Sequence, residues 1–284
     1  MNTSVRRIPC GSLTLELGAR TQIMGILNIT PDSFSDGGRY TAVEDAVRQA
    51  KLMVNEGADI LDIGGESTRP GAEPVSAEEE LNRVIPVLEA LKEASLSVPI
   101  SIDTYKAEVA RKALEAGAHI INDVWGFKRD PAMARTAAEY DCPVILMHNR
   151  TDTTYSNFLE DVAADLKESI RLAREAGVKE ERIILDPGIG FAKSYEQNLY
   201  LMNSLHTVRD LGYPVLLATS RKRSIQRTLD LPADEVVEGT IATVVLGIAQ
   251  GCEIVRVHDV RPNKKAAVMA DAIVRSHSTC EVRP

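Results

Sequence analysis

Short apolar segments recur along the chain, and each is followed by a stretch with the 3.6-residue spacing of an amphipathic helix. Ile, Leu and Val fill these segments without alternating with polar residues, which is typical of parallel strands covered on both faces. The pattern predicts strands at residues 22–27, 59–63, 99–102, 119–122, 143–147, 182–185, 214–218 and 253–257. Strands that alternate with helices predict an α/β fold, here a (β/α)8 TIM barrel, with a doubly wound open sheet as the alternative.

The boundaries of the predicted helices carry their own signals. Several helical patterns end in a glycine just before the next strand, as helix-to-strand connections usually do; these glycines are Gly57, Gly117, Gly177, Gly212 and Gly251. A Ser or Thr followed three residues later by Glu or Gln predicts capped helix starts at Thr41, Ser76 and Ser194. Asp130 followed by Pro131 predicts a further start, with proline at the first helical position.

Residues 5–16 precede this repeat and have the pattern of a short strand pair with a turn at Gly11-Ser12. They predict an N-terminal β-hairpin that closes the bottom of the barrel. No linker or low-complexity segment interrupts the sequence. We therefore expect one domain over residues 1–284, with the hairpin in 1–20, the barrel in 21–275 and a tail in 276–284.

Composition narrows the class of protein. The chain has 284 residues, is 44% hydrophobic and carries a net charge of −8, which argues against nucleic acid and anionic membranes as partners. Its four cysteines are scattered without CxxC spacing, as in a reduced cytoplasmic protein. The N-terminus has no apolar signal core, and the longest apolar run, Ile241 to Ala249, is too short to span a bilayer.

Polar residues collect where the predicted strands end. In a barrel of parallel strands the carboxyl ends share one face, so these side chains predict an active site there. A strand-end aspartate can equally cap the following helix, and this reading stays open for Asp62 and Asp103. The strand-end residues are Asn28, Asp62, Asp103, Asn122, His148, Asp186, Ser220, Arg256 and His258.

Two long loops add to this face. The first follows Asn28 and has the turn chemistry of Pro31 to Gly38, with Phe34 as an apolar side chain in its middle. The second runs from Gly64 to Gly71 and carries Arg69, a cation that could reach an anion. Loops of this kind often close over a substrate in barrel enzymes.

The residue types limit the chemistry of the site. Asp103, Asn122 and Asp186 suit a flat heterocycle with adjacent N–H donors, because a carboxylate accepts such donors in pairs. Asn28, Arg256, His258 and Arg69 suit a phosphate or diphosphate with Mg²⁺. A zinc site lacks a ligand set, since no HxH, HExxH or cysteine cluster occurs, and no GxSxG motif supports a serine nucleophile.

The strand-end motifs resemble those of bacterial dihydropteroate synthase, the folate-pathway enzyme that sulfonamides inhibit. The match covers about Thr21 to Ile273, and its motifs follow in order: LNITPDSFSDGG, DIGGESTRPGA, ISIDTYK, INDVWG, ILMHNR, ILDPGIGF, TSRK and RVHDV. The resemblance implies that 4-aminobenzoate displaces the diphosphate of 6-hydroxymethyl-7,8-dihydropterin diphosphate. It also implies a dissociative reaction through a pterin cation, a Mg²⁺ ion and a homodimer formed by late barrel helices.

The resemblance also implies residue roles. The catalytic residues would be Asp103, Lys222, Arg256, Asp36 and Arg69. The pterin would contact Asp103, Asn122, Met147, Asp186, Lys222 and Arg256. The diphosphate would contact Asn28, Thr68, Arg69, Arg256 and His258, with Asn28 as the metal ligand. The 4-aminobenzoate would contact Phe34, Thr68, Pro70, Phe191, Lys222 and Ser224. Ser35 and Asp36 of the first loop would close over the leaving group.

One segment departs from the family pattern. After Ser-Arg-Lys the family usually continues Ser-x-Ile-Gly, whereas this chain has Arg223, Ser224, Ile225 and Gln226, and Ala218 stands where glycine is common. The departure lies on the 4-aminobenzoate side, so it predicts reduced sulfonamide sensitivity or plain surface variation. Two other functions stay open: a methyltransferase module that binds a methylated folate, and a non-catalytic pterin-binding homologue.

Overall fold

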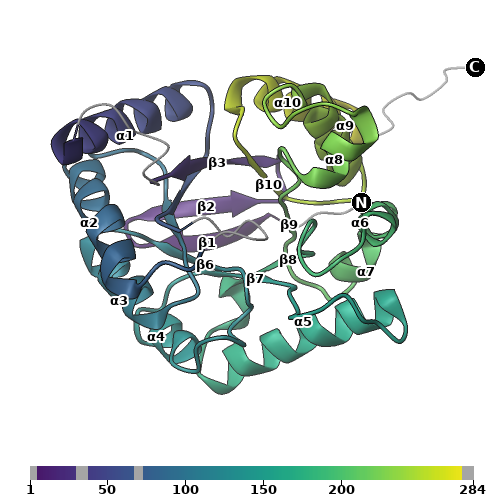
Figure 1. The fold of residues 1–284 in the computed structure, drawn as a ribbon, viewed down its shortest axis with the longest axis horizontal. Helices are drawn as coiled ribbons and strands as arrows, with labels where there is room; N and C mark the ends of the chain where they lie inside the picture. The colour runs from purple at the N-terminus through teal and green to yellow at the C-terminus, as the bar shows by residue number, and fades with distance from the viewer. Residues whose placement is uncertain (1–4, 30–37, 67–72, 277–284) are drawn as a thin grey trace, which may run out of the picture.

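The structure, a computed structural model, describes residues 5–29, 38–66 and 73–276. Parallel strands form one eight-stranded sheet in the order β8-β7-β6-β5-β4-β3-β10-β9 (Figure 1). A parallel bridge between Leu185 and Val215 joins β8 to the residue before β9, so the sheet is a nearly closed barrel. The strands are β3 (Gln22–Asn28), β4 (Ile60–Gly64), β5 (Ile100–Asp103), β6 (Ile120–Asp123), β7 (Val144–Met147), β8 (Ile183–Asp186), β9 (Leu216–Leu217) and β10 (Ile254–Val257). The predicted TIM barrel is confirmed, and the open-sheet alternative is wrong.

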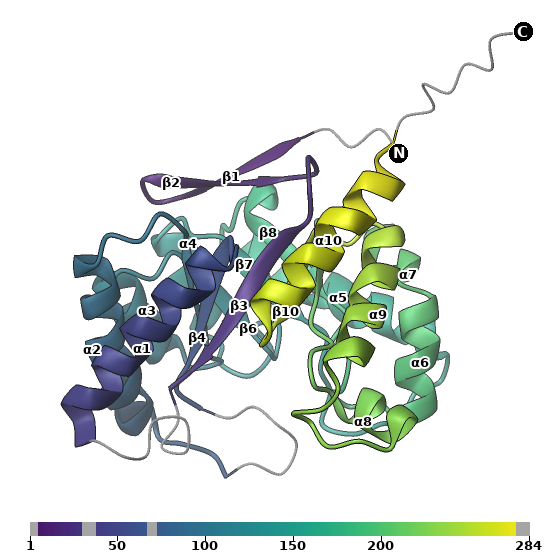
Figure 2. The same ribbon diagram turned by 90° about the horizontal axis from the view of Figure 1, so that it is seen from above.

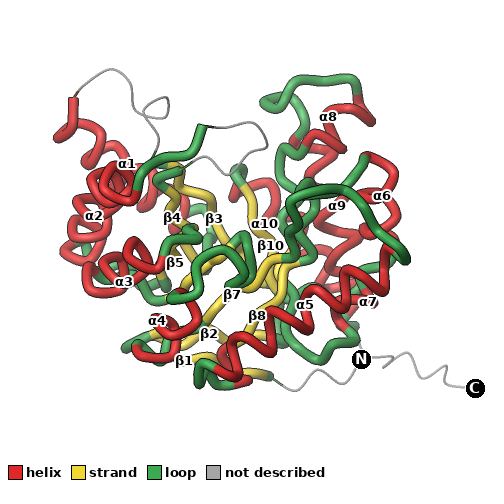
Figure 3. The backbone as a smooth tube through the Cα atoms, turned by 60° about the horizontal axis from the view of Figure 1, so that its bottom comes forward, coloured by secondary structure: helices red, strands yellow, loops and turns green. Residues whose placement is uncertain are grey.

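Helices enclose the strands, as the red and yellow segments of Figure 3 show. The helices are α1 (Gly38–Asn55), α2 (Ala77–Glu93), α3 (Ala107–Ala116), α4 (Met133–Glu139), α5 (Phe158–Glu175), α6 (Tyr195–Asn203), α7 (His206–Arg209), α8 (Arg223–Leu229), α9 (Val237–Ala249) and α10 (Val260–Val274), with a 3-10 turn η2 (Glu180–Arg182) before β8. Their inner faces bury Ala, Val, Leu and Ile against the outward side chains of the strands, such as Leu61, Ile102 and Leu146. This layer is the larger of the two cores.

The second core lies inside the barrel and includes the N-terminal hairpin. Strands β1 (Arg6–Cys10) and β2 (Leu13–Leu17) pair antiparallel, and Figure 2 shows them lying across one end of the barrel. Their buried side chains pack against the first inward residues of the barrel strands, including Met24, Ile60 and Ile120. The hairpin therefore closes the amino-terminal end, as predicted, and leaves the carboxyl end for chemistry. The buried hairpin residues are Ile8, Cys10, Leu15 and Leu17.

The glycines that were expected to end helices have the left-handed backbone conformation that is common just after a helix. Gly57, Gly117, Gly177, Gly212 and Gly251 all have positive φ, between 91° and 119°. At Gly117 the backbone N–H donates to Ala113 and Leu114 in the last turn of α3, which satisfies carbonyls that the helix leaves over. A side chain at these positions would be strained, so the helix-to-strand connections are fixed by residue type.

Not every predicted helix start is correct. Ser194 and Gln197 form a complete capping box at α6, and the Ser76 side chain accepts from the backbone N–H of Glu79 at α2. Thr41 is not a cap, because α1 already begins at Gly38. Asp130 is not the N-cap of α4 either, although it accepts from the first residue of α3. Its carboxylate accepts from the backbone N–H groups of Ala132 and Ala107, and α4 begins later, at Met133.

In the part of the chain that the structure describes, none of the helices has the length and apolar character needed to cross a membrane.

Candidate active site

The site follows from the two-residue period of the strands. In four of them an inward isoleucine of the interior core is followed, two residues later, by a polar side chain on the same face. The pairs are Ile60 with Asp62, Ile120 with Asn122, Ile184 with Asp186, and Ile254 with Arg256. The lower layer of the barrel is thus apolar and sealed by the hairpin, while the next layer toward the carboxyl end is charged.

Arg256 lies at the centre of this charged layer. Its Nε donates to Asp62 Oδ2 at 2.6 Å, and its Nη2 donates to Asp103 Oδ2 at 2.7 Å. Asn122 Nδ2 donates to the same Asp62 oxygen at 3.1 Å. Four strands of the barrel, β4, β5, β6 and β10, are therefore tied together by one guanidinium and one amide. The remaining oxygens, Asp62 Oδ1 and Asp103 Oδ1, are buried without a hydrogen-bond partner among the described residues.

This enclosure changes the acidity of the groups. Burial raises the pKa of Asp103 to about 7; the nearby Arg256 lowers it, and the negative charges of Asp62 and Glu80 raise it. Burial disfavours the charge on Arg256, but Asp62 and Asp103 outweigh this effect and raise its pKa. A carboxylate that is held between ionised and neutral forms near pH 7, beside a permanent cation, is typical of active sites.

Asp186 and Met147 face the same interior from neighbouring strands, where they are paired in register. Burial raises the pKa of Asp186 to about 6, against the effect of a hydrogen bond from the backbone N–H of Gly188 to its Oδ1 at 2.7 Å. Gly188 has φ 67°, and a Cβ atom there would lie 2.0 Å from the carbonyl oxygen of His148. Only glycine fits at this turn, so the sequence Asp-Pro-Gly fixes where the carboxylate points.

Lys193 holds the turn that follows Asp186. Its Nζ lies 2.9 Å from the carbonyl oxygen of Gly188, 3.0 Å from that of Phe191 and 2.8 Å from His148 Nδ1. His148 Nε2 in turn lies 3.0 Å from Asp165 Oδ2 on α5. His148 was grouped with the strand-end site residues, but its ring is fully buried in this network and points away from the barrel interior.

The segment after β9 brings Lys222 to the site. Its Nζ lies 4.2 Å from the centre of the Phe191 ring, which is a cation–π contact between two of the predicted 4-aminobenzoate residues. Helix α8 begins directly after Lys222, and Ser224 lies in its first turn. Ser220 Oγ accepts from the backbone N–H of His258 and lies 2.9 Å from His258 Nδ1. When the Ser220 hydroxyl donates to Nδ1, the proton of the neutral His258 ring lies on Nε2.

The structure gathers most of the predicted site residues at one end of the barrel. Asn28 ends β3 beside Gly64, and a Cβ atom on that glycine would lie 3.9 Å from the Asn28 Oδ1. The residues placed at this end are Asn28, Asp103, Asn122, Met147, Asp186, Phe191, Lys222, Ser224, Arg256 and His258. Phe34, Ser35, Asp36, Thr68, Arg69 and Pro70 lie outside the described residues. No group of three or more His, Cys, Asp or Glu side chains that could hold a metal occurs within 5–29, 38–66 and 73–276.

Two features were not assigned from sequence. For Asp62 a helix-capping role stayed open, yet its carboxylate accepts from Arg256 and Asn122; its two-residue offset from Ile60 is the sequence signal for this position. The second is an ion cluster where the chain leaves β4. Lys106 bonds both Glu66 and Glu80, and the Tyr105 hydroxyl donates to Glu66 at 2.9 Å. No spacing in the sequence relates these residues, because three different elements supply them.

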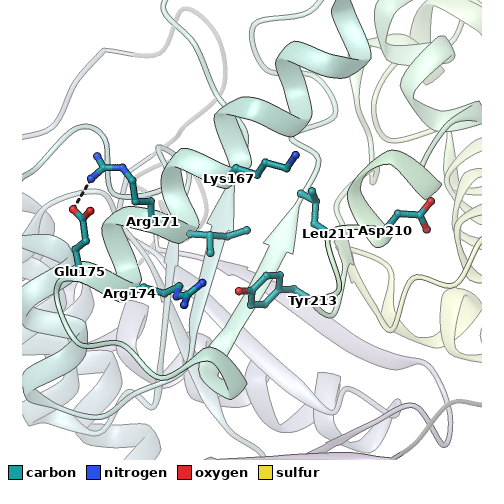
Figure 4. Close-up of a pocket in the computed structure, with 8 residues that line it drawn as sticks. Lys167, Arg171, Arg174, Glu175, Asp210, Leu211 and Tyr213 are labelled. Carbon is teal, nitrogen blue, oxygen red and sulfur yellow. Dashed lines mark hydrogen bonds and ion pairs between the residues drawn. The ribbon is translucent and has the colours of Figure 1, made fainter.

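A separate groove of about 770 Å³ lies between α5 and the segment after α7, on the outer surface (Figure 4). Lys167, Arg171 and Arg174 line it from α5, and Leu211 and Tyr213 line it from the other side. Arg171 forms a salt bridge with Glu175 one turn further along α5, and Arg174 forms one with Glu180. None of the barrel-mouth residues lines this groove, so it is not part of the candidate active site.

The family model described as "Pterin binding enzyme" matches residues 24–258, which is most of the chain. The chain therefore belongs to the class of pterin-binding enzymes. Its site is a set of buried carboxylates and an amide around one arginine, at the carboxyl end of the barrel. Two curated relatives narrow this class. The dihydropteroate synthase of Clostridium beijerinckii is 58% identical over 266 residues, covering 93% of this chain and 98% of that protein. The Bacillus subtilis enzyme is 60% identical over 255 residues, with 90% and 89% covered.

Solved structures agree with the relatives. The dihydropteroate synthase of Clostridium difficile, solved in the presence of pteroic acid, is 52% identical with a TM-score of 0.90, covering 92% of this chain and 100% of that one. The Xanthomonas albilineans enzyme with 4-aminobenzoic acid is 43% identical with a TM-score of 0.91, covering 96% and 100%. The chain belongs to the dihydropteroate synthase family and is a transferase of folate biosynthesis. Neither the methyltransferase nor the non-catalytic alternative is favoured.

Proposed function

We propose that the barrel mouth binds 6-hydroxymethyl-7,8-dihydropterin diphosphate and joins it to 4-aminobenzoate, giving 7,8-dihydropteroate and diphosphate. The observation that carries this proposal is the buried layer around Arg256, where Asp62, Asp103 and Asn122 meet. Such a layer presents planar acceptors at fixed positions in an apolar barrel, which suits a flat heterocycle with several N–H groups. The presence of pteroic acid and 4-aminobenzoic acid with the related enzymes supports the same substrates here.

In this proposal Asp186 and Asn122 bind the amide edge of the pterin, Met147 packs on the ring, and Lys222 contacts its other edge. Breaking the carbon–oxygen bond first would leave a positive charge delocalised into the ring. Asp103 then stabilises this charge, because an ionised carboxylate in a buried site interacts strongly with a cation. Its pKa of about 7 means that the ionised form gains population as pH rises through neutrality.

The diphosphate would lie further out, against Arg256, Asn28 and His258. The His258 ring suits this role, since Ser220 binds it on the Nδ1 side and a protonated Nε2 can donate to a phosphate oxygen. Thr68 and Arg69 are proposed to complete the set from the second loop, and Asp36 and Ser35 from the first.

Mg²⁺ is proposed to accompany the diphosphate. Among the residues with described positions the mouth offers the neutral amide oxygen of Asn28 at the end of β3, and no group of three or more His, Cys, Asp or Glu that could hold a metal. This fits Mg²⁺, which commonly keeps its waters and binds through substrate phosphates with few protein ligands. The ion would neutralise charge on the leaving group.

The 4-aminobenzoate would bind beside Phe191, Lys222 and Ser224, with Phe34, Thr68 and Pro70 from the two loops. Lys222 is a suitable partner for the carboxylate, and the Phe191 ring for the aniline ring. Sulfonamides would occupy the same place, as the complex of the Yersinia pestis enzyme with a sulfonamide drug suggests.

A homodimer is also part of the proposal. Apolar side chains are exposed on two helices that pack side by side, α9 and α10, and a monomer rarely exposes so many together. These side chains are Leu246, Val268, Met269, Ile273 and Val274. We expect sedimentation to give a dimer, and Met269→Glu to shift it toward the monomer. A cytoplasmic location is proposed on the buried free thiols of Cys10, Cys142 and Cys252.

Rescue of a synthase-deficient bacterium without folate products tests the proposed function, alongside diphosphate release in vitro. Release should need both substrates together. We expect Asp186→Ala to lose pterin affinity by more than about tenfold, because paired donors would be buried without an acceptor. Asp210→Ala, on the outer surface, is the matched control. Pterin affinity within about threefold of wild type in Asp186→Ala would place the pterin elsewhere.

A further inference from the structure

Asp62 is fully buried, yet nothing in the proposed reaction assigns it a task. One of its oxygens, Oδ2, accepts both from Arg256 Nε at 2.6 Å and from Asn122 Nδ2 at 3.1 Å. The other, Oδ1, is buried without a hydrogen-bond partner among the described residues. A buried carboxylate that is half unsatisfied costs stability, so a hydrophobic residue would suit the fold better unless the charge has a purpose.

The charge acts through Arg256, which Asp62 shares with Asp103. The guanidinium offers its Nε to Asp62 and its Nη2 to Asp103, so one positive charge faces two negative ones. Without Asp62, Arg256 would pair with Asp103 alone and neutralise it. With Asp62 present, the layer keeps an excess negative charge at the place where the pterin would become positive.

We propose that Asp62 is a positioning residue for the transferase reaction: its carboxylate fixes Arg256 and Asn122, and it keeps Asp103 only partly neutralised. The inference rests on the proposed pterin site and deepens it. Asp62 touches no substrate in this account. It acts on the cationic transition state through the two groups that it holds.

The hydrogen-bond pattern provides a variant that separates charge from geometry. In Asp62→Asn the amide oxygen can take the place of Oδ2 and still accept from Arg256 and Asn122. The amide nitrogen then replaces Oδ1, where no described donor opposes it. The variant can therefore keep both bonds while it removes the negative charge and places an amide NH2 group at the former Oδ1. Asp62→Ala removes the bonds as well.

A matched control exists on strand β6, two strands away in the sheet. Asp123 is also a fully buried strand-end aspartate, but it faces outward and accepts from the backbone N–H groups of Trp125 and Phe127, both at 2.8 Å. Asp123→Asn perturbs a buried carboxylate of the same kind without touching Arg256. It should lower the melting temperature and leave the pH dependence of turnover unchanged.

The experiment measures kcat, the KM for each substrate and the pH profile of the intact enzyme. For Asp62→Asn we expect kcat on the alkaline plateau to fall by roughly tenfold or more, with the pterin KM changed by less than about threefold. Asp103 is faced by Arg256, Lys222, Asp62 and Glu80, and removing the Asp62 charge lowers its pKa. The acid limb of kcat should thus move to lower pH. In Asp62→Ala the pterin affinity should fall too.

The outcomes are distinguishable. Wild-type kcat and an unmoved acid limb in Asp62→Asn, with a normal melting temperature, would overturn the role of Asp62. If Asp186→Ala also kept its pterin affinity, the proposed site itself would be wrong. If Asp62→Asn fails to fold, the same comparison is made with Asp62→Glu, which keeps the charge and displaces the bond. A wild-type kcat in that variant would exclude the positioning of Arg256.

Discussion

Replacing Lys193 by methionine would remove the three side-chain hydrogen bonds that Lys193 makes in the turn after Asp186. The lysine is half-buried, and its nitrogen is surrounded by the carbonyl oxygens of Gly188 and Phe191 and by His148 Nδ1. Methionine keeps the approximate length and the apolar stem of the side chain but has no hydrogen-bond donor. The substitution therefore tests the hydrogen bonds with little change in packing.

The protonation of the network follows from its partners. Burial lowers the pKa of His148 to about 4, so the ring is neutral near pH 7. Burial disfavours the ionised form of Asp165, but hydrogen bonds from His148 and Arg150 outweigh this and lower its pKa. An ionised Asp165 accepts a hydrogen bond from His148 Nε2–H, so Nδ1 is the acceptor nitrogen of the neutral ring. Lys193 Nζ consequently faces three acceptors: its ammonium form can donate to all three, and its neutral amine to two.

The expected loss of stability can be worked from these bonds. Leaving a buried acceptor unsatisfied costs on the order of 1–3 kcal/mol, and Lys193→Met leaves two, the Phe191 carbonyl and His148 Nδ1. The Gly188 carbonyl still accepts from the backbone N–H of Phe191 at 3.1 Å. The Phe191 carbonyl lies in a turn near the barrel mouth and can recover water, and the cost of burying a charge disappears. We therefore expect a net loss of about 2–4 kcal/mol, or a melting temperature lower by about 4–8 °C for a chain of this size.

Calorimetry of the purified enzyme measures this shift, with Lys167→Met as the control, since Lys167 is exposed on α5. The KM for 4-aminobenzoate should rise several-fold, because the turn carries Phe191 against Lys222. Burial lowers the pKa of Lys193 to about 7, whereas an unfolded lysine titrates near 10.5. Between these pH values the unfolded wild-type chain binds one proton more than the folded one. The free energy of unfolding of the wild type should therefore increase relative to that of Lys193→Met as pH rises.

Two results would refute the reasoning about Lys193. The first is a melting temperature within about 2 °C of wild type together with an unchanged KM for 4-aminobenzoate, which would mean that the turn needs no bond from Lys193. The second is a stability difference that shrinks as pH rises from about 7 to about 10, because the sign of the linkage would then be opposite to that of a buried base.

Three further predictions concern other parts of the molecule. Leu17→Ala in the hairpin should cost about 2–5 kcal/mol in unfolding free energy with unchanged KM values, and altered KM values would mean that the closed end affects the site. Titration calorimetry should show 4-aminobenzoate binding much more tightly with pyrophosphate, Mg²⁺ and a pterin present; equal affinity would contradict loop closure. Sulfonamide inhibition should improve by up to about tenfold in the variant Arg223→Ser, Ser224→Phe, Gln226→Gly, and equal inhibition constants would make the departure surface variation.

The sequence predicted the fold well because each barrel element is locally specified. Strand segments are apolar on both faces, helices end at glycines with positive φ, and the hairpin has its own turn at Gly11. All eight predicted strand segments contain or adjoin an observed strand, and the shortest is β9, reduced to Leu216 and Leu217. Helix starts were predicted less well, since Thr41 and Asp130 have capping side chains that the surrounding turns use differently.

Gln226, part of the departure from the family pattern after Lys222, has a structural role of its own. Helix α8 begins at Arg223, directly after Lys222. The Gln226 side chain donates to the carbonyl oxygen of Arg221 at 2.8 Å, and Arg221 has φ 56°. Gln226 thus stabilises a left-handed turn that glycine could not stabilise in this way. Its effect on drug binding, if the variant shows one, would act through the position of this turn.

The arrangement of charge in the site could not be predicted, although its members could be. Asp62 and Asp123 are both strand-end aspartates, and sequence alone offers each of them a cap or a site. The two-residue period decides between them: Asp62 shares the face of Ile60, which packs under the hairpin, whereas Asp123 is one residue beyond the inward Asn122 and faces the helices. Which inward groups then pair depends on strand register around the barrel, and that brings Arg256 of the last strand to Asp62 of the second. A residue 194 positions away cannot be identified by local pattern, so the negative charge shared around Arg256 is a property of the closed barrel.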